Sequence, residues 1–337
     1  MDTLETGLTR AAVWRGDRID IVEVPIPAPG SGEMVVRVRL ATVCGSDLHT
    51  VSGRRQAPCP SVLGHESVGE VVAVGADAPA RVGDRVVWSV TVTCGECDRC
   101  VRGLTAKCRR IRKVGHEAYD SEWALSGGYA EHIVLPLGTA VVVVPETLDD
   151  SVAAPAACAT ATVMAAVERA GDLSGRRVLI GGAGMLGTTA AAVCAHRGAH
   201  VLIADPKRAR LGQAMSFGAL PDDGENVDVV LDFTGATQFI GESLPRLEIA
   251  GTLVLAGSVT PGPLLGIDPQ QVVRQWWTIT GIHNYEPRHL REAIRFLSRT
   301  VDRHPWPQLV TDPVPLALIE SALQPAPGCK LRVAIAP

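Results

Sequence analysis

The sequence predicts a two-domain α/β protein, in which a β-rich unit is followed by a doubly wound domain with a parallel sheet. Three observations predict this fold class. The chain has 337 residues, about twice the length of a typical domain. Its first part, up to about residue 145, is built of short Val-rich segments that are broken by Gly, Pro or Asp. In the part that follows, short apolar segments alternate with segments of helical composition.

The N-terminal part has the pattern of a barrel-like β unit. Its strand candidates are short and Val-rich, and turn residues separate them: MVVRVRL, SVGEVVAVG, DRVVWSV and AEHIVLP. Evenly spaced short strands with many turns are typical of a β-barrel or sandwich.

The second part begins with an Ala-rich segment, SVAAPAACATATVMAAVERAG, which has the length and the closing Gly of a helix. Five strand candidates follow, namely RRVLI, HVLIAD, VDVVLDFTGA, GTLVLAGSV and WTITGI. Their alternation with helices indicates a parallel sheet with helices on both faces. The tail contains one helix, HLREAIRFLSR, and is too short for a domain. We therefore predict one domain over 1–145, completed by 288–337, and a second over 146–287.

Composition excludes several classes of function. A net charge of −4 gives no general attraction to nucleic acid or to an anionic membrane. No stretch reaches the roughly 20 apolar residues of a membrane span, and the first ten residues lack the pattern of a secretory signal. We expect a cytoplasmic protein whose partner is a small molecule rather than a nucleic acid or a membrane.

A glycine motif predicts a dinucleotide site. Gly182, Gly184 and Gly187 form G-x-G-x-x-G directly after a predicted strand, and Asp205 closes the next strand roughly 20 residues later. The glycines allow a tight turn, a close approach of the pyrophosphate and close packing of helix on strand, while the helix N-terminus faces the phosphates. The alternative is a Gly-rich turn that binds nothing.

Asp205 favours NAD over NADP, because its carboxylate accepts from a ribose 2′-hydroxyl and repels a 2′-phosphate. The basic residues Lys207, Arg208 and Arg210 leave NADP open. The predicted cofactor-binding residues are Gly182, Gly184, Met185, Leu186, Gly187, Asp205 and Arg210.

Four of the nine cysteines predict a structural metal site. They are spaced C-x₂-C-x₂-C-x₇-C, at Cys94, Cys97, Cys100 and Cys108. Four thiolates complete the tetrahedral shell of a structural zinc, and they also hold iron–sulfur clusters. The dehydrogenase-like second domain favours zinc.

A second group of potential ligands is spread over the chain. It comprises Cys44 in CGSDLH, His65 and Glu66 in GHE, and Cys158 in the Ala-rich helix. Sulfur and nitrogen ligands with one open position suit a catalytic zinc. Taken singly, each residue also has an ordinary reading, such as a buried packing cysteine or a turn histidine.

The order of these motifs resembles the zinc-containing medium-chain dehydrogenase/reductase superfamily along essentially the whole chain. The resemblance implies a GroES-like β-barrel catalytic domain that includes the C-terminal tail, an inserted Rossmann domain, and an active site in the cleft. It also implies two zinc ions per chain and a homodimer or homotetramer. Against this pattern the segment between Phe217 and Val227 is short, so we expect a Rossmann sheet trimmed at one edge.

Residue by residue, the resemblance assigns the catalytic zinc to Cys44, His65 and Cys158, with the acidic Glu66 beside it. Ser46 and His49 match the hydroxyl and the imidazole of a proton relay. The implied activity is that of an alcohol dehydrogenase: zinc polarises the substrate oxygen, Ser46 passes the proton by way of the cofactor ribose toward His49, and hydride moves to the nicotinamide.

Two other classes of function compete with this interpretation. Members that reduce double bonds usually lack the three zinc ligands, and a zinc-binding scaffold without activity would form no NADH. Two zinc ions per chain together with alcohol-dependent NADH formation would support the dehydrogenase alone.

The substrate is predicted from two further segments. Arg112, Lys113 and His116 follow the cysteine lobe, and cations there could hold an anion, although they could equally be solvated surface charges. Asn284 and Tyr285 fall on the positions of a polar pair in sorbitol-type members, with Asn where an Arg is expected. The segments CATATVMAA, GTLVLAGSV and GIHNYEPRHL also resemble a bacterial subfamily proposed to act in phosphonate metabolism. We predict a small polar, anionic alcohol or aldehyde; the alternative is an uncharged polyol or secondary alcohol.

Overall fold

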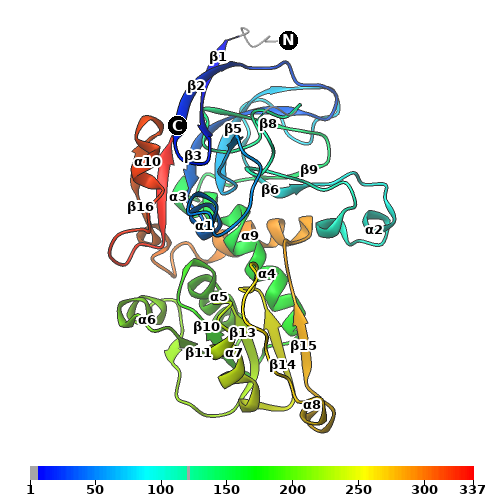
Figure 1. Ribbon diagram of the computed structural model, residues 1–337, viewed down its shortest axis with the longest axis vertical. Helices are drawn as coiled ribbons and strands as arrows, with labels where there is room; N and C mark the ends of the chain where they lie inside the picture. The colour runs from blue at the N-terminus through cyan, green and yellow to red at the C-terminus, as the bar shows by residue number, and fades with distance from the viewer. Residues whose placement is uncertain (1–6, 120–121) are drawn as a thin grey trace. The chain divides into compact units, whose positions relative to one another are not determined.

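The computed structural model describes residues 7–119 and 122–337, which fall into two compact units (Figure 1). Unit 1 holds the chain up to Cys158 together with Glu286–Val301 and Trp306–Pro337. Unit 2 holds Ala159–Tyr285 and Asp302–Pro305.

Unit 1 is built on β-sheets. A three-stranded antiparallel sheet has the order β2 (Ile19–Pro25), β1 (Leu8–Trp14), β4 (Ser61–Val62). A larger sheet has the order β16 (Val310–Pro315), β17 (Arg332–Ala336), β3 (Met34–Thr42), β5 (Ser67–Val74), β6 (Arg85–Val92), β7 (Arg112–Lys113); in addition β8 (His132–Leu135) pairs with β3 and β9 (Thr139–Val143) with β6. The pairing of β17 with β3 joins the C-terminal tail to the N-terminal sheet.

The strands of unit 1 follow the period-2 pattern of the sequence. In β3 the side chains of Arg37 and Arg39 are exposed, whereas Val36 and Val38 between and beside them are buried. The buried faces enclose a core that includes Trp88, Tyr129 and Ile133.

Short helices connect these strands: α1 (Gly45–Val51), α2 (Asp98–Val101), η1 (Thr105–Lys107), α3 (Asp150–Ala153), η2 (Ala154–Ala157), α9 (Pro287–Thr300), η4 (Trp306–Leu309), η5 (Leu316–Leu318) and α10 (Ile319–Ala322).

The predicted single Ala-rich helix is wrong in one respect, because the chain breaks it at Cys158. α3 passes into the 3₁₀ turn η2, Cys158 has φ −123° and ψ −65°, and α4 (Ala159–Ala170) begins after it. Pro155 explains the break, since it has no N–H to donate along an α-helix. α3 and η2 contact β3 and β5, so unit 1 extends to Cys158, beyond the change of sequence pattern at residue 145.

Unit 2 contains a six-stranded sheet in which every pair of neighbours is parallel. Its order is β12 (Leu220–Pro221), β11 (His200–Ala204), β10 (Arg177–Gly181), β13 (Val227–Asp232), β14 (Leu247–Leu255), β15 (Thr278–Gly281). This is the strand order 3-2-1-4-5-6 of the Rossmann fold, which confirms the predicted fold class. Besides α4, the connections contain α5 (Met185–His196), α6 (Arg208–Met215), α7 (Thr237–Ser243), η3 (Leu244–Arg246) and α8 (Pro269–Gln275).

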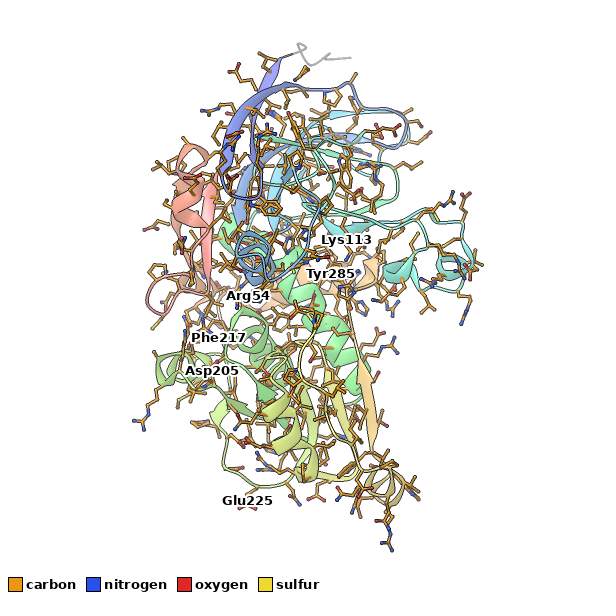
Figure 2. All side chains as sticks on the ribbon, viewed as in Figure 1. Arg54, Lys113, Asp205, Phe217, Glu225 and Tyr285 are labelled. Carbon is orange, nitrogen blue, oxygen red and sulfur yellow. The ribbon has the colours of Figure 1, made fainter. Side chains whose placement is uncertain are left out.

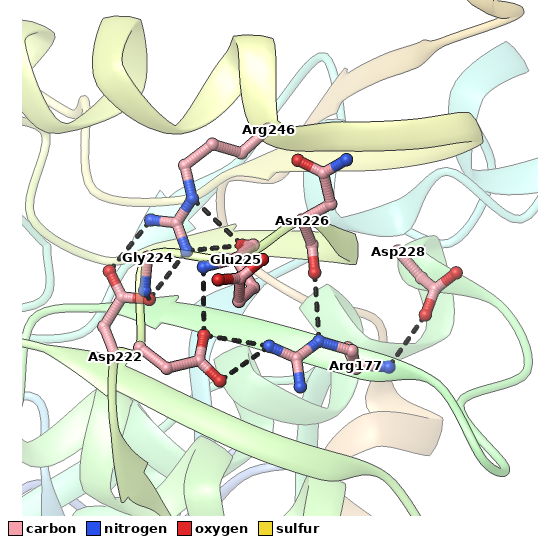
Figure 3. Close-up of polar contacts among 8 residues, drawn as sticks. Arg177, Asp222, Gly224, Glu225, Asn226, Asp228 and Arg246 are labelled. Atoms are coloured by element: carbon pink, nitrogen blue, oxygen red, sulfur yellow. Dashed lines mark hydrogen bonds and ion pairs between the residues drawn. The ribbon is translucent and has the colours of Figure 1, made fainter.

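The expected trimming of the sheet is found at its β12 edge. β12 has two residues, and a short turn leads from it to β13 without a helix. Two arginines hold this turn (Figure 3): Arg246 donates to both carboxylate oxygens of Asp222 at 2.8 and 2.7 Å, and Arg177 binds both oxygens of Asp223 at 2.9 and 2.8 Å. These two ion pairs hold the short turn between β12 and β13 in place.

Among the described residues no single helix is both long and apolar enough to cross a membrane; one bent pair, Asp150–Ala157 with Ala159–Ala170, meets that test by length and composition alone.

Candidate active site

The strand register brings together the ligand candidates that the sequence spreads over more than a hundred residues. β3 and β5 are antiparallel neighbours, and Ala41 pairs with Ser67. Cys44 follows the end of β3, as the N-cap of α1, while His65 and Glu66 directly precede β5. Cys158 joins them from the helix break. The ligand atoms of Cys44, His65, Glu66 and Cys158 all lie within 4.8 Å of one another.

This set of donors fits zinc. Two sulfurs and an imidazole nitrogen are the ligands of many zinc sites with an open position, and a carboxylate lies at the same centre. A hydrogen bond with the Cys158 thiol, helped by the charge of Arg332, lowers the pKa of the Cys44 thiol and favours the thiolate that a metal binds.

Asp47 orients the ligand segment. Its Oδ1 lies 3.3 Å from Nδ1 of His65, which leaves Nε2 for a metal; a carboxylate on the second nitrogen is the usual support of a histidine ligand. Its Oδ2 accepts from the backbone N–H of Cys44 at 3.0 Å and from the hydroxyl of buried Tyr129 at 2.9 Å. Sequence reasoning missed Asp47 and Tyr129, although Asp47 stands inside the motif CGSDLH.

Glu66 is fully buried and held from three sides. Arg332 donates to its two oxygens from Nε at 2.7 Å and from Nη2 at 2.9 Å, and the Thr42 hydroxyl donates at 2.7 Å. Burial raises the pKa of Glu66 to about 7, and the Arg332 charge acts in the opposite direction. Arg332 was not predicted, yet one arginine in the apolar run LRVAIA was a signal.

The two residues of the predicted relay lie on α1. The Ser46 hydroxyl is 3.2 Å from Nε2 of His65. His49 lies in the last turn, where burial and then the charge of Arg54 lower its pKa; its Nδ1 has no hydrogen-bond partner among the described residues.

The four-cysteine lobe also fits zinc. Four of the six sulfur–sulfur distances among Cys94, Cys97, Cys100 and Cys108 run from 3.5 to 4.0 Å, and all four sulfurs lie within 4.8 Å of one another. A tetrahedral shell with Zn–S bonds of about 2.3 Å places sulfurs about 3.8 Å apart, whereas a disulfide needs about 2.05 Å. Backbone N–H groups of residues 96 and 97 lower the pKa of Cys94 to about 6, while burial and neighbouring thiols raise that of Cys100 to about 12. A divalent cation bound by the four sulfurs would favour the thiolate form of Cys100, which burial and the neighbouring thiols disfavour.

One carboxylate fixes the end of the lobe. Glu286 accepts from the backbone N–H groups of Thr105 and Ala106, each at 3.0 Å, and from the Thr105 hydroxyl. It thereby caps η1 immediately before Cys108.

In unit 2 the glycine loop has the geometry that a phosphate site needs. Gly182 has a φ of 89°, a left-handed conformation that favours glycine. A Cβ on Gly187 would lie 1.7 Å from the carbonyl oxygen of Gly182, whereas a Cβ on Gly184 would meet nothing within 4 Å. Gly184 is the N-cap of α5, which Met185 and Leu186 begin. The loop therefore leaves open space at a helix N-terminus.

Asp205 directly follows β11 (Figure 2). Its carboxylate accepts from the backbone N–H of Ala183, inside the glycine loop, and from that of Lys207, each at 2.8 Å. Each oxygen keeps a further lone pair for a ribose hydroxyl. Arg210 lies in the first turn of α6, next to Arg208.

The predicted substrate residues lie in different surroundings. The Arg112 guanidinium lies 4.6 Å from the ring centroid of Trp123, and Lys113, its neighbour on β7, points to the other face of the strand. The His116 ring lies 5.1 Å from that of His65, and burial, with nearby positive charge, lowers its pKa to about 3. In unit 2, Tyr285 is buried and Asn284 has a φ of 62°.

Fold and site together define a class: metal-dependent dehydrogenases with a dinucleotide-binding domain. Residues 30–146 match the family model described as the alcohol dehydrogenase GroES-like domain. The chain is 34% identical over 291 residues to an L-threonine 3-dehydrogenase of Edwardsiella ictaluri, covering 79% of this chain and 81% of the relative. Among solved structures, an alcohol dehydrogenase from Thermotoga maritima has a TM-score of 0.90 at 27% identity, covering 98% of this chain and all of the other. A thermostable alcohol dehydrogenase from Pyrobaculum aerophilum, bound to cobalt and zinc, gives 0.84 at 26%, with 98% and 100% coverage.

The chain belongs to the zinc-type alcohol dehydrogenases of the medium-chain dehydrogenase/reductase superfamily. It is an oxidoreductase that acts on CH–OH groups with zinc and a nicotinamide dinucleotide. A bound zinc supplies Lewis-acid polarisation of the substrate oxygen. The donors Cys44, His65 and Cys158 would hold the zinc, with the Asp47 carboxylate 3.3 Å from Nδ1 of His65 and the Ser46 hydroxyl 3.2 Å from its Nε2.

Proposed function

We propose that the protein interconverts a small, polar, anionic alcohol and its aldehyde with NAD. In its most specific form, the proposal is that the anionic group of this substrate is a phosphonate. Cys44, His65 and Cys158 would hold the catalytic zinc, with Glu66 beside it, and Cys94, Cys97, Cys100 and Cys108 the structural zinc. Ser46 would take the alcohol proton and His49 release it.

One observation carries the choice of substrate: Arg55 and Lys113 are close enough for their charges to repel, and neither side chain forms an ion pair with a carboxylate of the described residues. Lys113 is partly buried, and no ion pair of its ammonium is found in the described part of the chain. Burial, and then the charges of Arg55 and Lys107, lower its pKa. A bound anion would relieve this repulsion, whereas an uncharged alcohol would not.

The proposal also names the cofactor and the oligomeric state. The carboxylate of Asp205 supports NAD, because it would repel a 2′-phosphate. We also propose a homo-oligomer formed through unit 2, as closed symmetric assemblies are common among such enzymes.

The test is a substrate panel at constant NAD concentration. We expect higher kcat/KM on 2-hydroxyethylphosphonate, or on phosphonoacetaldehyde in reverse, than on uncharged alcohols and aldehydes of similar size. L-Threonine belongs in the panel because relatives carry its name and because it bears a carboxylate. Equal activity on an uncharged polyol would contradict the anionic substrate and support the sorbitol-type alternative, which rests on Asn284 and Tyr285.

A further inference from the structure

The sequence analysis did not identify Arg55 as a site residue. Its side chain lies next to His116, which in turn lies next to the candidate metal ligand His65. Its Nη1 lies 3.3 Å from Nε2 of His116, and the His116 ring lies 5.1 Å from that of the ligand candidate His65. All three residues belong to unit 1. The Arg55 guanidinium is therefore linked to the candidate metal ligand His65 through one side chain, that of His116.

The hydrogen bond fixes the proton of His116. A guanidinium has only donors, so Arg55 donates and Nε2 of His116 accepts. The remaining proton of the imidazole then lies on Nδ1. That nitrogen is closed to solvent and has no hydrogen-bond partner among the described residues. The bond with Arg55 is therefore the one hydrogen bond that the His116 ring makes in the described part of the chain.

Arg55 itself lacks an acidic partner. Other arginines of unit 1 have one: Arg10 pairs with Glu131, Arg37 with Glu70, Arg85 with Asp150 and Arg109 with Asp98. Arg55 is partly buried, and no such pair involves it in residues 7–119 and 122–337. Buried or half-buried cations are usually paired.

The nearest carboxylates do not serve this role. Glu117 accepts from the backbone N–H of Lys113 at 2.7 Å, and Asp47 binds Cys44 and Tyr129. Arg55 also lines an open pocket of about 600 Å³, with polar Thr50, Ser52 and Gln56, so a small solute can reach it.

We propose that Arg55 is the residue that selects an anionic substrate: it binds the anion directly, and its hydrogen bond to His116 holds the guanidinium in place. Lys113, whose pKa the Arg55 charge lowers, adds a second positive group. This inference rests on the proposed function and names the residue that gives the site its charge preference. The class of ligand is a phosphonate or carboxylate group carried by a small hydroxy or carbonyl compound.

The experiment compares charged and uncharged substrates in matched variants. Arg55→Met should raise KM for 2-hydroxyethylphosphonate about 10- to 100-fold, as expected for the loss of a hydrogen bond to a charged group, and should change kcat/KM for an uncharged alcohol of similar size less than about threefold. Arg55→Lys should restore part of the loss. Arg81→Met is the control, because Arg81 is an exposed arginine of unit 1 whose side chain makes no hydrogen bond or ion pair with the described residues.

The role of His116 is tested through the acceptor that it offers to Arg55. A Gln amide oxygen replaces Nε2, so His116→Gln should retain the charge preference, whereas His116→Phe should lose it. Binding of methylphosphonate, measured by calorimetry, should weaken in Arg55→Met and His116→Phe but not in Arg81→Met. Zinc content per chain should stay constant in all variants.

The outcomes separate the two proposals. A wild-type enzyme without preference for anions overturns the proposed substrate and this inference with it. A wild-type enzyme that prefers anions, together with an Arg55→Met variant that keeps this preference or loses both substrates equally, overturns the inference alone. An Arg81→Met variant as defective as Arg55→Met does so as well.

Discussion

Arg332 binds Glu66 through two hydrogen bonds inside the protein, from Nε to Oε2 at 2.7 Å and from Nη2 to Oε1 at 2.9 Å. The pair connects β17, near the C-terminus, to the residue before β5. The same guanidinium has its Nη2 3.6 Å from the sulfur of Cys44. The tail of the chain is thus part of the candidate zinc site.

Removing this arginine should destabilise the protein strongly. Arg332→Met leaves the buried carboxylate of Glu66 with the Thr42 hydroxyl but without an opposite charge, and breaking a buried ion pair from one side costs about 3–5 kcal/mol. The free energy of unfolding, from urea titration of the zinc-loaded protein, is the measurement. Arg37→Met is the matched control, because its pair with Glu70 is exposed on the surface and worth at most about 1 kcal/mol. Similar losses in the two variants would contradict the role of the Arg332 pair.

Much of the fold could be predicted because periodicity and glycine spacing are local properties. The five apolar segments became β10, β11, β13, β14 and β15, and the short connection after Phe217 gave the two-residue strand β12. The break before Cys158 had a signal in the sequence, because Pro155 disfavours a continuous helix. The prediction of one helix followed the Ala-rich composition of the whole segment and passed over this residue.

The site was predicted less completely than the fold, for a physical reason. Motifs show residues that lie next to each other in sequence, so the groups of Cys44 and of His65 were identifiable. Arg332 and Tyr129 act across strands and far along the chain, and only the register of β17, β3 and β5 brings them to the ligands. Arg55 was overlooked because its partner, His116, is 61 residues away.

The two zinc ions should be separable by mutation. Cys100→Ser should lower thermal stability and soluble yield, because a structural zinc contributes folding free energy. His65→Ala should abolish turnover and leave a folded protein that still binds NADH. Metal analysis should find one zinc fewer per chain in each variant. A folded but inactive Cys100→Ser variant, together with an unfolded His65→Ala variant, would reverse the two roles.

Cofactor choice should depend on Asp205. The wild-type enzyme should prefer NAD, and Asp205→Ala should weaken NAD binding while improving the use of NADP, since a negative charge is removed. The loss should exceed one ribose contact, because the carboxylate also holds the N–H of Ala183 in the glycine loop. kcat/KM for each cofactor measures the effect. Better use of NADP by the wild type would show that Lys207, Arg208 or Arg210 governs the choice.

Unit 2 exposes large apolar side chains that predict self-association. Leu264 is 97% exposed, Trp276 74% and Val273 72%, all of them before the edge strand β15, which pairs with β14 alone among the described strands. Such groups at a sheet edge are typical of an interface. Sedimentation at micromolar concentration should therefore find a dimer or tetramer.

The variant Leu264→Asp with Trp276→Ser should shift this equilibrium toward monomer, because it places a charge and removes an aromatic ring where a second copy would pack. Val101→Ser is the control: Val101 is 76% exposed, but it belongs to α2 of unit 1 and not to unit 2. Its sedimentation should match that of the wild type. A wild-type monomer, or a double variant that still assembles, would mean that these side chains do not form the interface.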